Sequence, residues 1–213
     1  MIRISLIRHA EPYFEDEDEK AIFLGARTDY PVGPEGTIQA DELYHHFISD
    51  PFGMVWHSGL LRTRSTSQIV SDFPFTAIQV EPRIREIDMG LWDGLSKAEV
   101  MELYPQEYKE REAIRESPAF FELPFPEGES FLDLQKRAVE GLLNIVQIAQ
   151  EGGVDHILVV GHKSVNRVIL CHFLGFDLRQ MFTFKQDYCA INVLQAGISD
   201  DGTTSITVEK TAE

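Results

Sequence analysis

Two histidines stand directly after apolar runs that are typical of buried β-strands. His9 follows Arg8 at the end of the run Ile2–Ile7, and His162 follows the run His156–Gly161. Open α/β sheets bind ligands at the carboxyl ends of their strands, where both side chains are expected to lie. An arginine fork binds phosphate, and a neutral imidazole can act as a nucleophile toward phosphorus. These residues therefore predict phosphoryl chemistry in one site built from distant parts of the chain.

Two further segments carry groups that suit the same chemistry. Ser58 is expected to cap a helix whose first turn holds Arg62, so that free N–H groups and the guanidinium face an anion. Glu86 lies in the segment Arg83–Gly94 among apolar neighbours, with glycines that allow tight turns. A carboxyl group held near apolar side chains and an anion suits a general acid. Taken alone, each segment fits a surface role equally well or better.

Composition limits the partners and the setting. The chain has 213 residues, 43% of them hydrophobic, which is typical of one water-soluble globular domain. Its net charge of −16 disfavours nucleic acid and anionic membranes as partners. No apolar run approaches the roughly 20 residues that cross a bilayer, the N-terminus lacks a signal-peptide cleavage region, and the two cysteines have no metal-ligand spacing. We therefore expect a reduced, cytoplasmic setting.

The elements that position these residues alternate along the chain. We expect strands near 2–7, 53–57, 76–80, 156–161, 189–196 and 204–209, and helices near 35–48, 61–72, 96–115, 130–150 and 164–174. The helix at 130–150 is the clearest, because its apolar residues recur at steps of three and four and Gly152-Gly153 stops it. The alternation predicts an α/β fold, a three-layer sandwich with a mostly parallel central sheet flanked by helices.

No linker, repeat or low-complexity tract divides the chain, so residues 1–213 are expected to form a single domain. The segment Ser117–Glu129 contains three prolines and predicts a long loop. Long loops inside compact domains are often functional lids, which makes the segment around 96–130 lid-like. The acidic run Glu15–Glu19 predicts a solvated loop, with a flap beside the site as the alternative.

Together the motifs resemble those of the histidine phosphatase superfamily, the phosphoglycerate-mutase-like proteins. Arg8–Ala10 corresponds to the family's Arg-His-Gly motif, Ser58–Arg62 to its Ser-Pro-Leu-x-Arg segment, and Glu86–Gly94 to its Glu-Ile-Asp-x-Gly-x-Trp-x-Gly pattern. Its Gly-Glu-Ser-Phe segment and its second histidine motif match Gly128–Phe131 and Gly161-His162. The five motifs occur in order between residue 2 and about residue 175, which makes the resemblance specific.

The resemblance implies a phosphatase that needs no metal and no cofactor and acts on a small phosphorylated metabolite. His9 would attack phosphorus and form a phosphohistidine. Arg8, Arg62 and His162 would hold the phosphoryl oxygens. Glu86 would protonate the departing alkoxide and later take a proton from the hydrolytic water. A homodimer is the candidate assembly.

Several positions depart from the family pattern. Ala10 replaces the glycine of the first motif, so its backbone is expected to keep φ below zero or to absorb a small strain. Glu15 stands near a position where many members carry a phosphate-binding asparagine, and we expect it to turn outward. Lys163 follows His162 where glycine is common, and it is a candidate for binding a second acidic group on the substrate. Arg27 is a second candidate for substrate binding.

Two other functions stay open from the sequence. The first is a phosphoglycerate mutase, which returns the phosphoryl group to the substrate, although the segment Tyr104–Gly128 resembles the phosphatase branch, including fructose-2,6-bisphosphatase-like sequences. The second is a non-catalytic protein that binds a phosphorylated ligand. Ala10, Glu15 and Lys163 keep this second alternative open.

Overall fold

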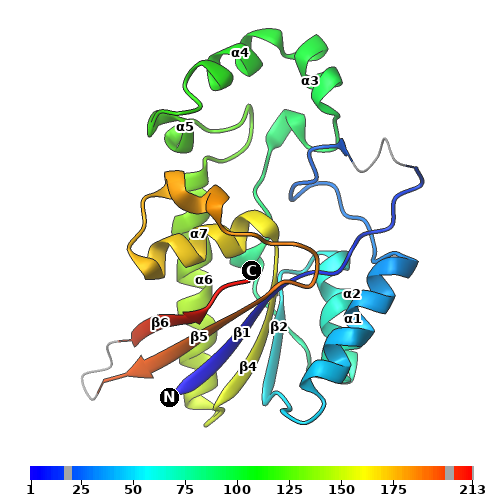
Figure 1. The fold of residues 1–213 in the computed structure, drawn as a ribbon, viewed down its shortest axis with the longest axis vertical. Helices are drawn as coiled ribbons and strands as arrows, with labels where there is room; N and C mark the ends of the chain where they lie inside the picture. The colour runs from blue at the N-terminus through cyan, green and yellow to red at the C-terminus, as the bar shows by residue number, and fades with distance from the viewer. Residues whose placement is uncertain (17–20, 200–203, 213) are drawn as a thin grey trace.

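The computed structural model describes residues 1–16, 21–199 and 204–212, and its helices and strands alternate along most of the chain (Figure 1). The strands are β1 (Ile2–Arg8), β2 (Met54–His57), β3 (Gln79–Val80), β4 (His156–Gly161), β5 (Ile191–Ile198) and β6 (Thr204–Lys210). The α-helices are α1 (Pro34–Phe47), α2 (Leu61–Ser71), α3 (Lys97–Leu103), α4 (Pro105–Ala113), α5 (Ala119–Glu122), α6 (Phe131–Glu151) and α7 (Lys163–Leu174). Short 3₁₀ turns are η2 (Phe75–Ala77), η3 (Pro82–Ile84), η4 (Gly90–Trp92) and η5 (Leu178–Thr183).

The central sheet has the strand order β3-β2-β4-β1-β5-β6. Strands β3, β2, β4 and β1 pair in parallel, whereas β5 pairs antiparallel with both β1 and β6. The predicted α/β fold with a mostly parallel sheet between helices is therefore confirmed. At the centre of the sheet Arg8 pairs with Gly161, so His9 and His162 leave neighbouring strands at the same level.

Both faces of the central strands are buried, which explains why β1 and β4 are almost continuously apolar. In β1, Ile4 and Leu6 belong to a core shared with α6 and α7, whereas Ile7 belongs to a core shared with α1 and α2. In β4, Val159 and Val160 divide between the same two cores. Successive strand residues point to opposite faces, so one apolar run supplies both layers.

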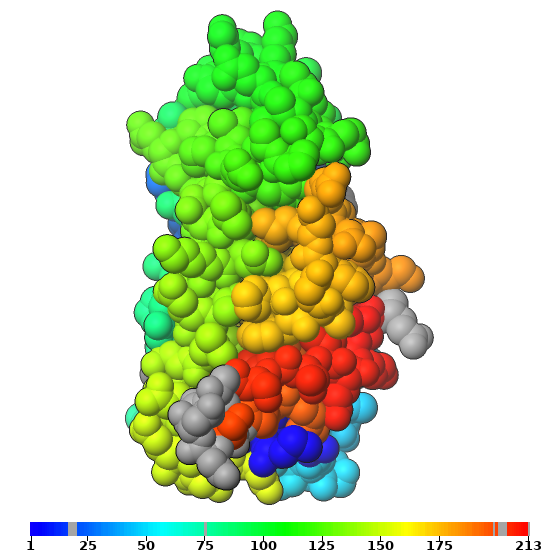
Figure 2. Space-filling model, turned by 90° about the vertical axis from the view of Figure 1, so that its left-hand side faces the viewer, coloured from blue at the N-terminus to red at the C-terminus, as the bar shows by residue number. Residues whose placement is uncertain are grey.

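Helix α6 covers much of one face of the sheet and begins and ends as the sequence predicts. Ser130 and Asp133 form a capping box at its start, and Gly152 caps its end. Its buried residues follow the expected steps of three and four, as at Leu134, Ala138 and Leu142. Figure 2 shows this side of the molecule, with α6 running beside α7 and, further down, beside β6.

The segment from 96 to 130 lies beyond the carboxyl ends of the central strands, at the top of Figure 1. The predicted helix at 96–115 is interrupted, because Pro105 has no N–H to donate and disfavours helical backbone at Tyr104, which adopts φ −130° and ψ 53°. The predicted loop Ser117–Glu129 contains the short helix α5. The expected strand at 76–80 is reduced to two paired residues, preceded by η2. The role of a lid stays a prediction.

Three further observations concern the described residues. None of their helices is long and apolar enough to cross a membrane. Within them, no group of three or more histidine, cysteine, aspartate or glutamate side chains is arranged to hold a metal ion. Of the acidic run Glu15–Glu19, residues 17–19 lie outside the described part, and Glu15 is exposed.

Candidate active site

His9 is held at the carboxyl end of β1 as a neutral imidazole. Its Nδ1 lies 2.8 Å from the carbonyl oxygen of Ala10, and a carbonyl can only accept, so Nδ1 carries the proton. The Nε2 lone pair is then available. Burial, followed by the charges of Arg62 and Arg8, lowers the pKa of His9 well below its ordinary value of 6.5. The side chain is therefore an unprotonated imidazole at neutral pH, which is the state that a nucleophile requires.

His162 faces His9 across the site, with ring centroids 5.1 Å apart. Its Nε2 lies 2.8 Å from Ser58 Oγ, which is also 2.9 Å from Thr63 Oγ1. Because the Thr63 hydroxyl donates to the Leu60 carbonyl oxygen, the Ser58 hydroxyl donates to Thr63, and His162 Nε2–H donates to Ser58. This chain of hydrogen bonds fixes the orientation and the tautomer of the His162 ring.

The expected capping role of Ser58 is wrong. Helix α2 begins at Leu61, its N-cap residue is Leu60, and no side chain caps it. Between β2 and α2 the backbone turns at Gly59, where φ is +97° and a side chain would be strained. This turn sends Ser58 into the core, where it is fully buried against His162 instead of facing the helix end.

Two arginines complete the positive side of the site. Arg62 is fully buried in the first turn of α2 and donates Nη1 and Nη2 to the carbonyl oxygens of Thr28 and Gly25. Arg8 donates Nη1 to the carbonyl oxygen of Gln186. Among the buried nitrogens that have no hydrogen-bond partner in the described part of the chain, three belong to this site, namely Arg8 Nε, Arg62 Nε and His162 Nδ1. The two arginine nitrogens are donors, and buried donors without partners are costly unless a ligand accepts from them, as a phosphate oxygen would.

Glu86 approaches the same site from the segment that follows η3. It is 5% exposed, and its carboxylate accepts from its neighbour Ile87 N–H at 2.9 Å and from Ser164 N–H at 3.3 Å. Arg137 of α6 donates to the Glu86 carbonyl oxygen and forms an ion pair with Glu129. The general-acid candidate is therefore held through its backbone by a side chain from another element.

Comparison with known proteins agrees with this geometry. A sequence model of the histidine phosphatase superfamily (branch 1) matches residues 4–208. The chain belongs to this superfamily. Phosphoserine phosphatase 1 of Hydrogenobacter thermophilus is 28% identical over 194 residues, which are 91% of this chain and 86% of that protein. The prediction of a histidine phosphatase is thereby confirmed.

Solved structures of phosphatases share the fold. An alpha-ribazole phosphatase from Shigella flexneri superposes with a TM-score of 0.78 and 21% identity, covering 100% of this chain and 96% of that chain. A phosphoserine phosphatase mutant from Entamoeba histolytica, solved with phosphoserine, has a TM-score of 0.76 and 19% identity. This superposition covers 100% of the present chain and 98% of the Entamoeba histolytica chain.

The histidine phosphatase site brings together five of the seven residues singled out in the sequence, namely Arg8, His9, Arg62, Glu86 and His162. The other two candidates lie at its edges. Arg27 donates Nε and Nη2 to both carboxylate oxygens of Asp88 and Nη2 to the Glu127 carbonyl oxygen, so its fork is engaged by the protein itself. Lys163 is the first residue of α7, directly after His162.

The departures from the family pattern are accommodated. Ala10 is buried, is not among the residues with positive φ, and donates its N–H to Thr66 Oγ1 at 2.9 Å. The expectation that φ at Ala10 stays below zero is thus confirmed. Glu15 is exposed, as expected for a carboxylate that turns outward.

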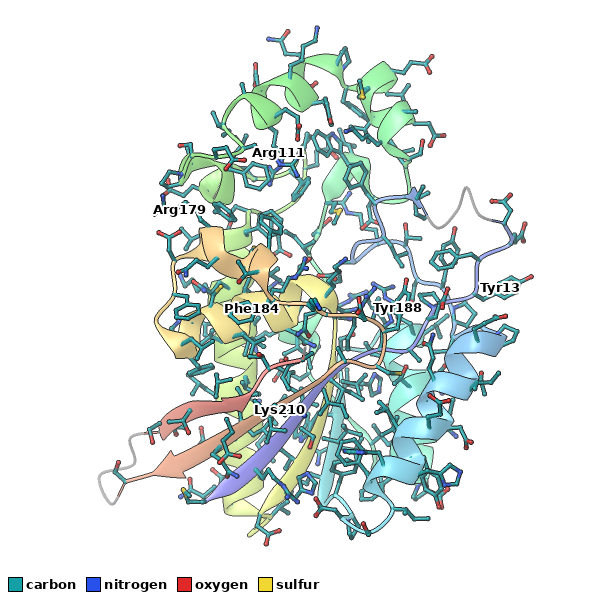
Figure 3. All side chains as sticks on the ribbon, viewed as in Figure 1. Tyr13, Arg111, Arg179, Phe184, Tyr188 and Lys210 are labelled. Carbon is teal, nitrogen blue, oxygen red and sulfur yellow. The ribbon has the colours of Figure 1, made fainter. Side chains whose placement is uncertain are left out.

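One residue of the site was missed from the sequence. The guanidinium carbon of Arg8 lies 3.8 Å from the ring centroid of Tyr188, and the Tyr188 ring lies 5.7 Å from that of His9. Figure 3 shows Tyr188 on the loop that crosses above the sheet before β5. Since β5 is antiparallel to β1, its start lies beside the end of β1, so a correct strand direction would have placed Tyr188 here.

Proposed function

We propose that the chain is a phosphomonoesterase that hydrolyses a small phosphorylated metabolite through a phosphohistidine on His9. The observation that carries the proposal is the state of His9, which is buried and neutral with its Nδ1 proton held by Ala10. Two arginines and a second histidine surround it. A neutral nucleophile among fixed cations suits the attack on a phosphate dianion.

The reaction divides into two displacements. In the first, His9 Nε2 forms a bond to phosphorus, the bond from phosphorus to the alkoxide oxygen breaks, and Glu86 gives that oxygen a proton. In the second, a water oxygen attacks phosphorus, the phosphorus–nitrogen bond breaks, and the Glu86 carboxylate takes the water's proton. Arg8 and Arg62 offset the charge on the phosphoryl oxygens in both steps, and His162, whose pKa burial and the charge of Arg62 lower well below 6.5, lines the site as a neutral ring.

The named relatives support hydrolysis over return of the phosphoryl group to substrate, because the compared proteins of similar length are called phosphatases. A cytoplasmic location and a homodimer belong to the same proposal and stay predictions.

The proposal is tested by hydrolysis of a panel of sugar phosphates and phosphoglycerates, with and without a chelator. We expect release of inorganic phosphate that the chelator does not affect, together with an acid-labile phosphoenzyme after brief mixing with radiolabelled substrate. His9→Ala should keep the fold and abolish both. Near-normal hydrolysis by His9→Ala would refute the covalent route, and transfer of label to a second phosphoglycerate would indicate a mutase.

A further inference from the structure

Helix α7 presents two cations beside the phosphoryl site. Lys163 begins the helix directly after His162, and Arg167 follows four residues later. Side chains four residues apart on a helix lie on one face, so the two cations stand together. Like charges at this spacing repel each other. In a chain with a net charge of −16, carboxylates that could pair with the two cations are plentiful.

No carboxylate in the described part of the chain lies within ion-pair distance of Lys163 or Arg167. Arg167 donates Nε to the Phe184 carbonyl oxygen at 2.9 Å, which fixes its guanidinium at the loop before β5. Arg8 binds the same loop at Gln186 and Tyr188. Arg167 and Arg8 therefore contact one loop, Phe184–Tyr188, labelled at both ends in Figure 3, and Lys163 lies one helical turn before Arg167.

Electrostatics place the two cations close to the reacting groups. Burial, followed by the charge of Arg8, lowers the pKa values of both Lys163 and Arg167, and Glu86 and Asp187 oppose the shift. The charges of Arg8 and Glu86, which belong to the phosphoryl site, therefore act on both side chains.

We infer that Lys163 and Arg167 bind a carboxylate of the substrate while its phosphate lies between Arg8 and Arg62. This inference rests on the proposed function and names the substrate class, a phosphomonoester of a small carboxylic acid. The charge of the subsite favours a carboxylate over a second phosphate. Glu86 and Asp187 offset much of the positive charge of the two cations, so a singly charged carboxylate suits the subsite better than a phosphate dianion.

The test measures binding in the His9→Ala protein, so that it does not depend on turnover. Dissociation constants are compared by calorimetry for two pairs of ligands that differ in the carboxylate: phosphoserine against phosphoethanolamine, and 3-phosphoglycerate against glycerol 3-phosphate. We expect the carboxylate member of each pair to bind at least about tenfold more tightly, since a hydrogen bond to a charged group has about this value.

Lys163→Met in the same background should remove most of this preference and leave the two reference ligands unchanged. Lys210→Met, which removes the same unit charge from the exposed face of β6, is the control and should preserve the preference. Equal binding within both pairs, or equal weakening of all four ligands by Lys163→Met, would overturn the inference. So would a preference that appears only for fructose 1,6-bisphosphate over fructose 6-phosphate.

The outcome is separable from that of the proposed function. A wild-type protein that hydrolyses phosphomonoesters without a carboxylate preference keeps the proposed function and loses the subsite. A protein that prefers the carboxylate ligands but hydrolyses none of them keeps the subsite and loses the proposed function.

Discussion

Replacing Ser58 by alanine tests whether the hydrogen-bond chain behind His162 serves the reaction. The hydroxyl accepts from His162 Nε2–H, donates to Thr63, and also lies 3.3 Å from the Leu60 N–H. The change leaves two buried donors and one acceptor unpaired at a fully buried position. We therefore expect the free energy of unfolding to fall by about 1–3 kcal/mol.

The effect on activity should be larger than this structural cost alone suggests. Ser58 holds the His162 ring at Nε2 and leaves Nδ1 without a protein partner, so Ser58→Ala releases the orientation of the ring beside the phosphoryl group. A preorganised hydrogen bond to a charged group is worth about 1.5–3 kcal/mol, so kcat/KM should fall by about 10- to 150-fold. Inhibition by inorganic phosphate should weaken in the same variant.

Thr63→Val is the matched control, because it removes a hydroxyl from the same chain and leaves Ser58 bonded to His162. We expect it to lower the free energy of unfolding by a similar amount and to change kcat/KM by less than about threefold. The measurements are urea unfolding and steady-state hydrolysis of an aryl phosphate. Equal losses of activity in the two variants would show that Ser58 acts through the fold and would refute this reasoning.

Three further predictions concern the arginine, the acid and the pH. Arg62→Ala should lose about 2–4 kcal/mol of transition-state stabilisation, as for one preorganised donor. Arg62→Lys should recover only part of this loss, because a lysine lacks the planar donors that bind the carbonyl oxygens of Gly25 and Thr28. A kcat/KM of Arg62→Ala equal to that of the wild type would show that Arg62 takes no part in the reaction. Glu86→Gln should slow sugar phosphates far more than an activated aryl phosphate, whose leaving group needs little protonation, whereas Asp88→Asn should slow both alike; a uniform loss in Glu86→Gln would remove the acid role. Buried histidines with lowered pKa values, such as His57 at about 4, take up protons on unfolding. The free energy of unfolding should therefore fall as the pH drops below about 6.5, by about 1.4 kcal/mol per pH unit for each such histidine. Urea midpoints that stay constant between pH 7 and pH 5 would contradict this.

The central strands and the residues at their ends could be predicted from the sequence because each rests on a local pattern. An apolar run predicts a buried strand of a parallel sheet, so the residues that follow it, here Arg8 and His9, are placed at the end of that strand. The helix α6 was equally clear, since its capping residues and its apolar spacing agree.

The interactions that the sequence did not reveal are long-range. Ser58 looks like a capping residue in its own segment, and only the approach of β4 to β2 brings His162 to its hydroxyl. Tyr188 follows no strand-end pattern and meets Arg8 because β5 runs antiparallel to β1. Arg27 donates to Asp88, which lies 61 residues away in the sequence. Local residue types cannot encode such partners.

The position of β1 in the sheet has a consequence for how the chain folds during synthesis. Both strands that pair with β1 are far away in sequence, since Arg3 pairs with His156 and with Gln195. A growing chain therefore carries an apolar first strand without a partner until some 150 further residues have been made. Closing so long a loop is entropically costly and slows folding. Nascent chains of this protein should accordingly depend on chaperones until β4 emerges from the ribosome, and His9 should meet His162 only at that stage.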